Sequence, residues 1–245
     1  MNRAVALLSG GLDSATAAAI VRSEGSEVFP LAVAYGQRHA VELEAARNVA
    51  KALLLPELRI VQIDLRAIGG SALTAPIEVP KGRSAAAIAS DVLGAAVPIT
   101  YVPARNTIFL SVALSYAETL GAFDLVIGAN ALDYSGYPDC RSEYLESFER
   151  MAQLATRAGL EGRGRYRVRA PLIAMTKAEI IRRAMELGVP LELTQSCYDP
   201  APDGAACGAC DACVLRRKGF EEAGVLDPTR YQTGVAVSPR HSQNR

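Results

Sequence analysis

The sequence predicts an α/β protein built on a doubly wound parallel sheet, with a small metal-binding region near its C-terminus. Short apolar runs alternate with amphipathic stretches along most of the chain, as repeated βαβ units require. The first apolar run, 3–8, is almost continuous, which is typical of a central strand buried on both faces. Four cysteines gather between Cys197 and Cys213. This spacing is too close for a disulfide framework and indicates a metal site.

The first elements form one βαβ unit. The strand 3–8 ends in the glycine-rich turn 9–14, and a helix over 15–24 follows. We expect this helix to stop at Gly25, because glycine is common just after helix C-termini. A second strand is expected at 28–34. From residue 41, apolar side chains recur every four positions with charged ones between them, which predicts an amphipathic helix before a third strand at 58–63.

Residues 65–98 interrupt the alternation, and we interpret them as an insertion or flap because their short apolar pieces show no period. The alternation resumes with a helix at 106–120, a strand at 124–128 and a helix at 142–158. The apolar side of that last helix is expected to consist of Tyr144, Phe148, Met151 and Ala155.

The final helix of the predicted sheet domain begins at a capping box, in which Thr176 and Glu179 each satisfy a backbone N–H of the other. Its buried stripe is expected at Ile180, Ile181, Ala184 and Leu187. We therefore expect an α/β domain at 1–190, a four-cysteine helical region at 191–226 and a tail at 227–245.

Composition excludes several classes of protein. The chain has 245 residues, half of them apolar, and its 26 basic and 26 acidic side chains cancel. Such a chain can bury a large core, whereas disordered segments and nucleic-acid modules usually carry a strong net charge. No apolar run approaches the ~20 residues of a membrane span, and no apolar leader follows Met1. We expect a cytoplasmic protein that binds neither membranes nor nucleic acid, in a reducing compartment that suits its free cysteines.

The turn Ser9-Gly-Gly-Leu-Asp-Ser14 has the features of a phosphate-binding loop. It follows a strand and begins a helix, so backbone N–H groups and the helix dipole can hold an anion without a lysine. It fits neither the G-x-x-x-x-G-K-[ST] pattern nor the G-x-G-x-x-G pattern. The alternative is a tight turn that binds nothing.

The cysteine cluster has the spacing C-x9-C-x2-C-x2-C. Four thiolates can close a tetrahedral sphere with no open position, which is the form of a structural zinc site. An iron–sulfur cluster is the main alternative, although no proline follows the last cysteine. The remaining alternative is that the four thiols bind no metal. The ligands of one structural zinc ion would be Cys197, Cys207, Cys210 and Cys213.

The loop matches the SGGxDS signature of the PP-loop ATP pyrophosphatases at all five fixed positions, and in this the chain resembles that superfamily. The resemblance implies an adenine nucleotide alpha hydrolase-like fold and ATP with Mg²⁺ as co-substrate. It makes Asp13 and Ser14 catalytic, with Asp13 helping to place the magnesium ion. The ATP-binding residues it implies are Leu8, Ser9, Gly10, Gly11, Leu12, Asp13, Ser14, Ala15, Thr16, Ala17 and Ala18.

Three further segments, 35–39, 101–106 and 133–141, are rich in polar side chains where strands of the sheet should end. Together with 170–173 and the cysteine cluster, they resemble the 7-cyano-7-deazaguanine synthase (QueC) family over about 3–224. The resemblance implies an ATP-dependent ligase that turns 7-carboxy-7-deazaguanine and ammonia into the nitrile. The intermediates of this reaction would be an adenylated carboxylate and an amide, and its product would serve queuosine or archaeosine biosynthesis. The resemblance is also compatible with a homodimer.

Roles outside the loop follow from charge and hydrogen-bonding capacity. Arg38, Arg105 and Lys177 are candidates to hold phosphate or carboxylate charge, of which Arg105 and Lys177 are expected to be catalytic; the alternative for each is a solvated surface cation. Asp139 can accept both hydrogen bonds of a purine N–H pair. The expected substrate-binding residues are Gln37, Arg38, Asn106, Tyr134, Ser135, Asp139 and Arg141.

Two other functions compete with this one. A tRNA-thiolating PP-loop enzyme would carry a persulfide on Cys140, but it would need a basic RNA-binding surface. A non-catalytic zinc-bearing nucleotide sensor would bind ATP without releasing AMP. In the ligase, Cys140 is a small buried residue of the substrate loop, and His39 can be an ordinary loop residue.

Overall fold

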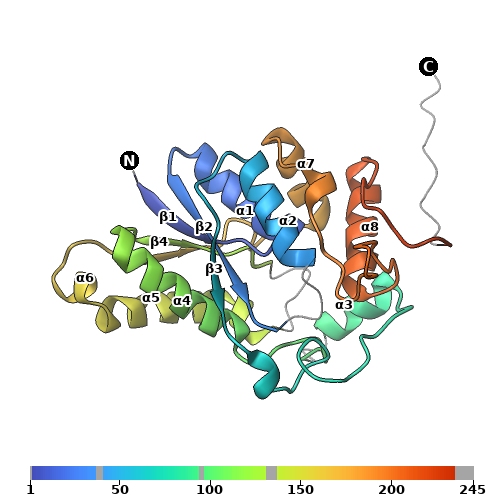
Figure 1. The fold of residues 1–245 in the computed structure, drawn as a ribbon, viewed down its shortest axis with the longest axis horizontal. Helices are drawn as coiled ribbons and strands as arrows, with labels where there is room; N and C mark the ends of the chain where they lie inside the picture. The colour runs from blue at the N-terminus through green and yellow to red at the C-terminus, as the bar shows by residue number, and fades with distance from the viewer. Residues whose placement is uncertain (1, 37–40, 94–96, 131–136, 235–245) are drawn as a thin grey trace.

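A five-stranded, fully parallel sheet forms the centre of the computed structural model, which describes residues 2–36, 41–93, 97–130 and 137–234 (Figure 1). Its strand order is β3-β2-β1-β4-β5. The strands are β1 (Arg3–Leu7), β2 (Glu27–Ala34), β3 (Arg59–Gln62), β4 (Asp124–Val126) and β5 (Arg167–Arg169). The order reverses between β1 and β4, and this is the point at which a doubly wound sheet binds its ligands. The predicted fold class is confirmed.

Helices cover both faces of the sheet. They are α1 (Leu12–Ser23), α2 (Val41–Ala52), α3 (Ala85–Leu93), α4 (Arg105–Leu120), α5 (Ser142–Ala155), α6 (Arg157–Leu160), α7 (Lys177–Glu186) and α8 (Asp211–Ala223). Short 3-10 turns stand at η1 (Leu65–Ala67), η2 (Pro138–Cys140) and η3 (Leu191–Leu193). Within the described residues, no helix is long and apolar enough to cross a membrane.

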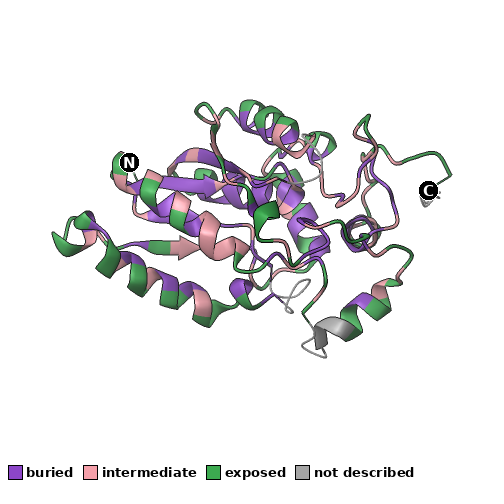
Figure 2. Cartoon of the chain, turned by 60° about the horizontal axis from the view of Figure 1, so that its bottom comes forward, coloured by how far each residue is buried: buried purple, intermediate pink, exposed green. Residues whose placement is uncertain are grey.

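The alternation of side chains along β1 explains the two main core layers. Ala4 and Ala6 pack with α1, α2 and α7 on one face, whereas Val5 packs with α4 and α5 on the other. The middle residues of the central strands are accordingly mostly buried, and many exposed residues lie on the outer sides of the helices (Figure 2).

A third core cluster joins residues 65–102 to the four cysteines. Leu65, Ala72, Leu73 and Val79 are buried against them, together with Val102. The bridge between Lys81 and Cys210 and the ion pair of Arg83 with Asp211, at 3.0 Å, hold the two segments together. The segment that the sequence predicts as an insertion or flap therefore packs against the cysteine region.

Three details of the sequence prediction are wrong. The helix expected at 142–158 is two helices, because Thr156 is extended and its side chain accepts a hydrogen bond from the Gly159 N–H at the start of α6. The buried side of α5 consists of Leu145, Phe148 and Ala152, whereas Met151 and Ala155 are exposed. The strand β5 is not among those expected from the sequence. It contains one apolar residue between two arginines, which form ion pairs with Asp124 and Glu24.

Candidate active site

A cavity of about 250 Å³ opens at the carboxyl ends of the strands, where the strand order reverses. Leu7 at the end of β1 and Ser9 just beyond it line the cavity, as do Tyr35 after β2 and residues 127–130 after β4. The five loop residues on its wall are Ser9, Gly11, Leu12, Asp13 and Ser14. Leu8 and residues 15–18, also expected to bind ATP, lie in or beside the core behind this wall.

The loop is held in shape by its own serines. Ser14 Oγ donates to the Gly11 carbonyl at 3.0 Å and accepts the backbone N–H of Ser9 at 3.2 Å. Gly10 has φ +82°, and a Cβ there would lie 2.6 Å from the Glu42 carbonyl oxygen. Glycine is therefore required both for the backbone conformation and for the close approach of α2. Because α1 begins at Leu12, its N-terminal N–H groups lie at the cavity.

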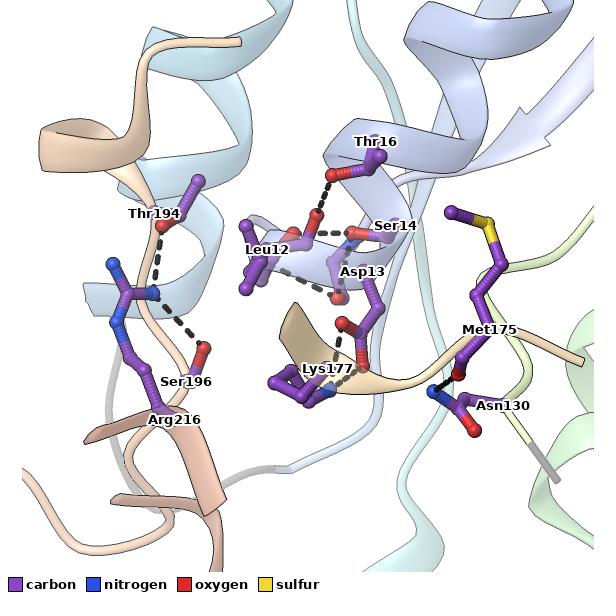
Figure 3. Close-up of polar contacts among 12 residues, drawn as sticks. Leu12, Asp13, Ser14, Thr16, Asn130, Met175, Lys177, Thr194, Ser196 and Arg216 are labelled. Carbon is purple, nitrogen blue, oxygen red and sulfur yellow. Dashed lines mark hydrogen bonds and ion pairs between the residues drawn. The ribbon is translucent and has the colours of Figure 1, made fainter. Parts of the chain in front are cut away.

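Asp13 and Lys177 meet at the cavity wall. Lys177 Nζ lies 2.8 Å from both carboxylate oxygens of Asp13 (Figure 3). The predicted capping box is present, with Thr176 and Glu179 bonded to each other, and it places Lys177 as the first residue of α7. Gly219 of α8 leaves room for the stem of this buried lysine, since a Cβ there would clash with the Lys177 side chain.

Arg105 lies at the start of α4 and contributes a cation to the cavity. Its guanidinium lies 5.9 Å from the centre of the Tyr35 ring. Burial acts to lower the pKa of Arg105, but the phenol groups of Tyr35, Tyr137 and Tyr198 outweigh it and raise that pKa. Burial, assisted by Glu42, raises the pKa of Tyr35 to about 12. At neutral pH the site therefore holds a charged arginine and a neutral tyrosine.

The candidate substrate residues divide into four groups. Asn106 lines the cavity, and its backbone N–H donates to Asp139 Oδ2 at 3.0 Å. Asp139 is buried behind the cavity, and burial raises the pKa of its carboxyl group. Arg141 is exposed and does not line the cavity. Outside the described residues lie Gln37, Arg38, His39, Tyr134 and Ser135.

Cys140 lies on the cavity wall beside Asn106. Its sulfur accepts a hydrogen bond from Asn106 Nδ2 at 3.2 Å. Burial raises the pKa of the Cys140 thiol to about 12. The group is therefore a neutral thiol at physiological pH, which is unlike the depressed pKa of reactive cysteines.

The four clustered cysteines form a metal site. Their sulfur atoms all lie within 4.8 Å of one another and all four residues are buried. Cys207 Sγ and Cys213 Sγ are 4.0 Å apart, close to the separation of about 3.8 Å that tetrahedral Zn–S bonds of about 2.3 Å impose. Backbone N–H groups of Asp199 and Cys207 point to Cys197 Sγ, as thiolate ligands require. The donor set fits a structural zinc ion.

The segment before the first cysteine connects the metal site to the phosphate loop. The Gln195 N–H donates to the Gly10 carbonyl at 2.9 Å. Arg216, which is 2% exposed, donates to Thr194 Oγ1 at 2.8 Å and to Ser196 Oγ at 3.3 Å (Figure 3). Because Ser196 also lines the cavity, the cysteine region forms one wall of the site.

Sequence reasoning missed several residues of this wall. Glu42 falls on the polar side of its helix pattern, and that pattern cannot distinguish solvent from a polar cavity. No sequence pattern marks Arg216 as a residue of the site, because its place there depends on its hydrogen bonds to Thr194 and Ser196, between α7 and α8. The lining residues not expected from the sequence include Glu42, Asn130, Gln195, Ser196, Tyr198 and Arg216.

The reversed strand order, with a lysine-free phosphate loop beside it, defines an ATP-using enzyme of the PP-loop class. The family model described as queuosine biosynthesis protein QueC matches residues 3–224. The chain belongs to this family.

Relatives are similar to the chain over most of its length. The 7-cyano-7-deazaguanine synthases of Myxococcus xanthus and Geobacter sulfurreducens are 61% and 59% identical to it. The alignments cover 94% and 95% of this chain and 98% and 94% of those proteins. The solved structure of NMN synthetase from Francisella tularensis is 16% identical, with a TM-score of 0.47, over 91% of this chain and 77% of that chain.

Proposed function

We propose that the chain is an ATP-dependent ligase that converts 7-carboxy-7-deazaguanine and ammonia into 7-cyano-7-deazaguanine. The observation that carries this proposal is its 61% identity, over 94% of its length, to a protein of that name. The cavity adds physical support, because it combines an anion-binding loop with the charged groups of Asp13, Lys177 and Arg105. The small-molecule substrates are ATP, ammonia and the deazaguanine acid.

The reaction needs two activations of the same carbon. The substrate carboxylate attacks the α-phosphate of ATP, pyrophosphate leaves, and ammonia then displaces AMP to form the amide. A second ATP adenylates the amide oxygen, and loss of AMP completes the nitrile. Residues 9–14 would bind the departing pyrophosphate, whose charge needs stabilisation more than it needs a side-chain base. Lys177 and Arg105 would balance the charge that develops on the phosphates and the carboxylate.

Two metal ions have residues in this chain that suit them. Asp13 would hold Mg²⁺, which supplies charge neutralisation for the phosphates when it is bound. The structural zinc ion would be held by the four cysteines and would stabilise the fold directly. Since four thiolates would leave no open position on the zinc ion, it would bind neither water nor substrate.

The remaining assignments rest on the same proposal. Gln37, Arg38, Tyr134 and Ser135 are proposed to contact the deazaguanine, with Asn106, Asp139 and Arg141. We further propose a cytoplasmic enzyme that does not bind nucleic acid and that forms a homodimer. The division into 1–190, 191–226 and 227–245 is also a proposal.

A tRNA-thiolating activity is the less favoured candidate. It would require Cys140 to carry sulfur as a nucleophile, whereas burial raises the pKa of that thiol to about 12. The formal net charge of zero also gives no excess of cations for an RNA backbone.

The deciding experiment incubates the protein with 7-carboxy-7-deazaguanine, ATP, Mg²⁺ and ammonium and identifies the products by mass spectrometry. The proposal predicts the nitrile, with two AMP and two pyrophosphate released for each nitrile formed. Omission of ammonium should stop the reaction at the adenylate. ATP binding without AMP release would indicate a nucleotide sensor instead.

A further inference from the structure

Glu42 lies at the active site although no part of the proposed function has used it. It stands in the first turn of α2, and its backbone carbonyl contacts the phosphate loop at Gly10. Its side chain lines the same cavity as Asp13, Ser14 and Arg105. Glu42 therefore lies beside the loop that would bind ATP.

Asp13 and Glu42 are the two carboxylates among the described residues that line the cavity. Asp13 is held by Lys177 at 2.8 Å. None of the described side chains donates a hydrogen bond to the Glu42 carboxylate or forms an ion pair within 4 Å of it. Glu42 is thus the carboxylate of this wall that remains able to accept a proton from a substrate.

The surroundings of Glu42 adjust its protonation. Burial raises the pKa of the Glu42 carboxyl group to about 7, and the attraction of Arg105 partly opposes the rise. A base with such a pKa is present as carboxylate in half of the molecules near neutral pH, where general-base catalysis is most efficient. The ionisable side chains that line the cavity with it come from every element around it: Asp13 of α1, Tyr35 after β2, Arg105 of α4, Tyr137, Cys140 of η2, Lys177 of α7, Tyr198 and Arg216 of α8.

We propose that Glu42 is the general base that removes protons from the nitrogen atom that enters the product. This inference rests on the proposed function, in which the same nitrogen loses one proton as the amide forms and two as the nitrile forms. One carboxylate beside the adenylate can serve both steps, because both take place at the same carbon and nitrogen and release the same leaving group, AMP.

In the first step, ammonia uses its lone pair to form the C–N bond with the acyl adenylate. Glu42 takes one proton from the resulting ammonium nitrogen, and AMP leaves with the electron pair of the C–O bond. In the second step, the amide oxygen has been adenylated and one N–H proton has passed to water. Glu42 takes the last N–H proton, its electron pair becomes the third C–N bond, and AMP again leaves with the C–O pair. The proton on Glu42 then passes to water.

The experiment compares Glu42→Gln with Glu44→Gln, a matched variant of an exposed glutamate on the same helix. Glu42→Gln should still adenylate 7-carboxy-7-deazaguanine, as measured by pyrophosphate exchange, but should form the amide and the nitrile at least about 100-fold more slowly. The same loss is expected when the amide is supplied as substrate without ammonium. Glu44→Gln should behave as wild type, and Glu42→Asp, which keeps a carboxylate, should retain part of the rate.

The pH profile gives an independent readout. With rates expressed per concentration of free ammonia, wild type should lose activity as pH falls through about 7, because the Glu42 carboxylate becomes protonated there. Glu42→Gln should not show this loss of activity at low pH, whereas Glu42→Asp should still show one.

Three results would overturn the inference. The first is nitrile synthesis by Glu42→Gln at close to the wild-type rate. The second is a loss confined to the KM for 7-carboxy-7-deazaguanine with the pH profile unchanged, since Glu42 would then bind the substrate and not move a proton. The third is a failure of adenylation equal to the failure of amidation. Wild-type protein that makes no nitrile would refute the proposed function itself, and the role of Glu42 with it.

Discussion

Lys177 binds Asp13 across 164 positions of the sequence, with its Nζ atom 2.8 Å from each carboxylate oxygen. Each residue stands in the first turn of a helix, α1 for Asp13 and α7 for Lys177. Two helix N-termini therefore converge on the cavity, and both favour negative charge there. The lysine adds a full positive charge, which the loop itself lacks.

This ion pair should contribute both to adenylation and to stability, and the two contributions can be measured separately. Asp13→Asn should reduce adenylation by about 100-fold or more, because a charge-stabilising group is lost. It should also lower the free energy of unfolding by about 3 kcal/mol, since the buried Lys177 ammonium loses the Asp13 carboxylate. AMP release and urea unfolding measure the two effects.

The double variant Asp13→Asn with Lys177→Met supplies the control. It should recover part of the lost stability, because the buried ammonium that has lost the Asp13 carboxylate is removed as well, but none of the activity. Wild-type AMP release from Asp13→Asn would remove Asp13 from the catalytic residues.

Much of the fold was predictable, because its signals are local. The strands β1 to β4 are mainly apolar runs that sheet burial requires, and the box of Thr176 and Glu179 marks the start of α7. The edge strand β5 gives no such signal. Its two arginines are held by Asp124 and Glu24, from distant parts of the chain.

The candidate site was predictable by residue type more than by contact. Asp13 and Lys177 are both expected from the sequence to be catalytic, but no local pattern indicates that they touch. Glu42 has the spacing of a solvated helix face, and only the tertiary fold turns that face toward a cavity. Arg216 depends in the same way on the loop that it holds.

Ser14 tests how much the loop's shape matters. Its hydroxyl connects the Gly11 carbonyl to the Ser9 N–H, so Ser14→Ala should leave the fold intact but loosen the loop and slow adenylation by roughly 100-fold. Ser23→Ala is the matched control, because Ser23 lies at the other end of α1, where its hydroxyl donates to the Ile20 carbonyl. Equal AMP release from the two variants would contradict a role for Ser14.

The cysteine cluster should contribute to both stability and ATP binding. Replacing any of its four cysteines with serine should lower solubility and thermal stability, since a closed thiolate site contributes folding free energy. Loss of the metal should also weaken ATP binding, because Gln195, two residues before Cys197, is bonded to Gly10 of the phosphate loop. Isothermal titration with ATP before and after chelation measures that effect.

Elemental analysis of anaerobically purified protein identifies the metal. About one zinc per chain is expected from a single four-thiolate site. Iron with acid-labile sulfide would instead establish a cluster of the iron–sulfur type.

Cys140 provides the sharpest test against a sulfur-carrying mechanism. It lies on the cavity wall, where a nucleophile would be well placed, yet burial raises the pKa of its thiol to about 12. Neither the adenylation nor the attack by ammonia needs a thiolate. Cys140→Ser keeps a small side chain that can accept the hydrogen bond of Asn106 Nδ2.

Cys140→Ser should therefore retain substantial nitrile synthesis, with at most a several-fold loss from the altered packing. Cys140→Ala, which cannot accept that hydrogen bond, should lose more, because one N–H of the half-buried Asn106 amide then loses its protein acceptor. Both rates are measured as nitrile formed under saturating ATP and ammonium. If Cys140→Ser bound ATP and substrate normally but made no nitrile, the thiol would take part in the chemistry and a covalent mechanism would replace the one proposed.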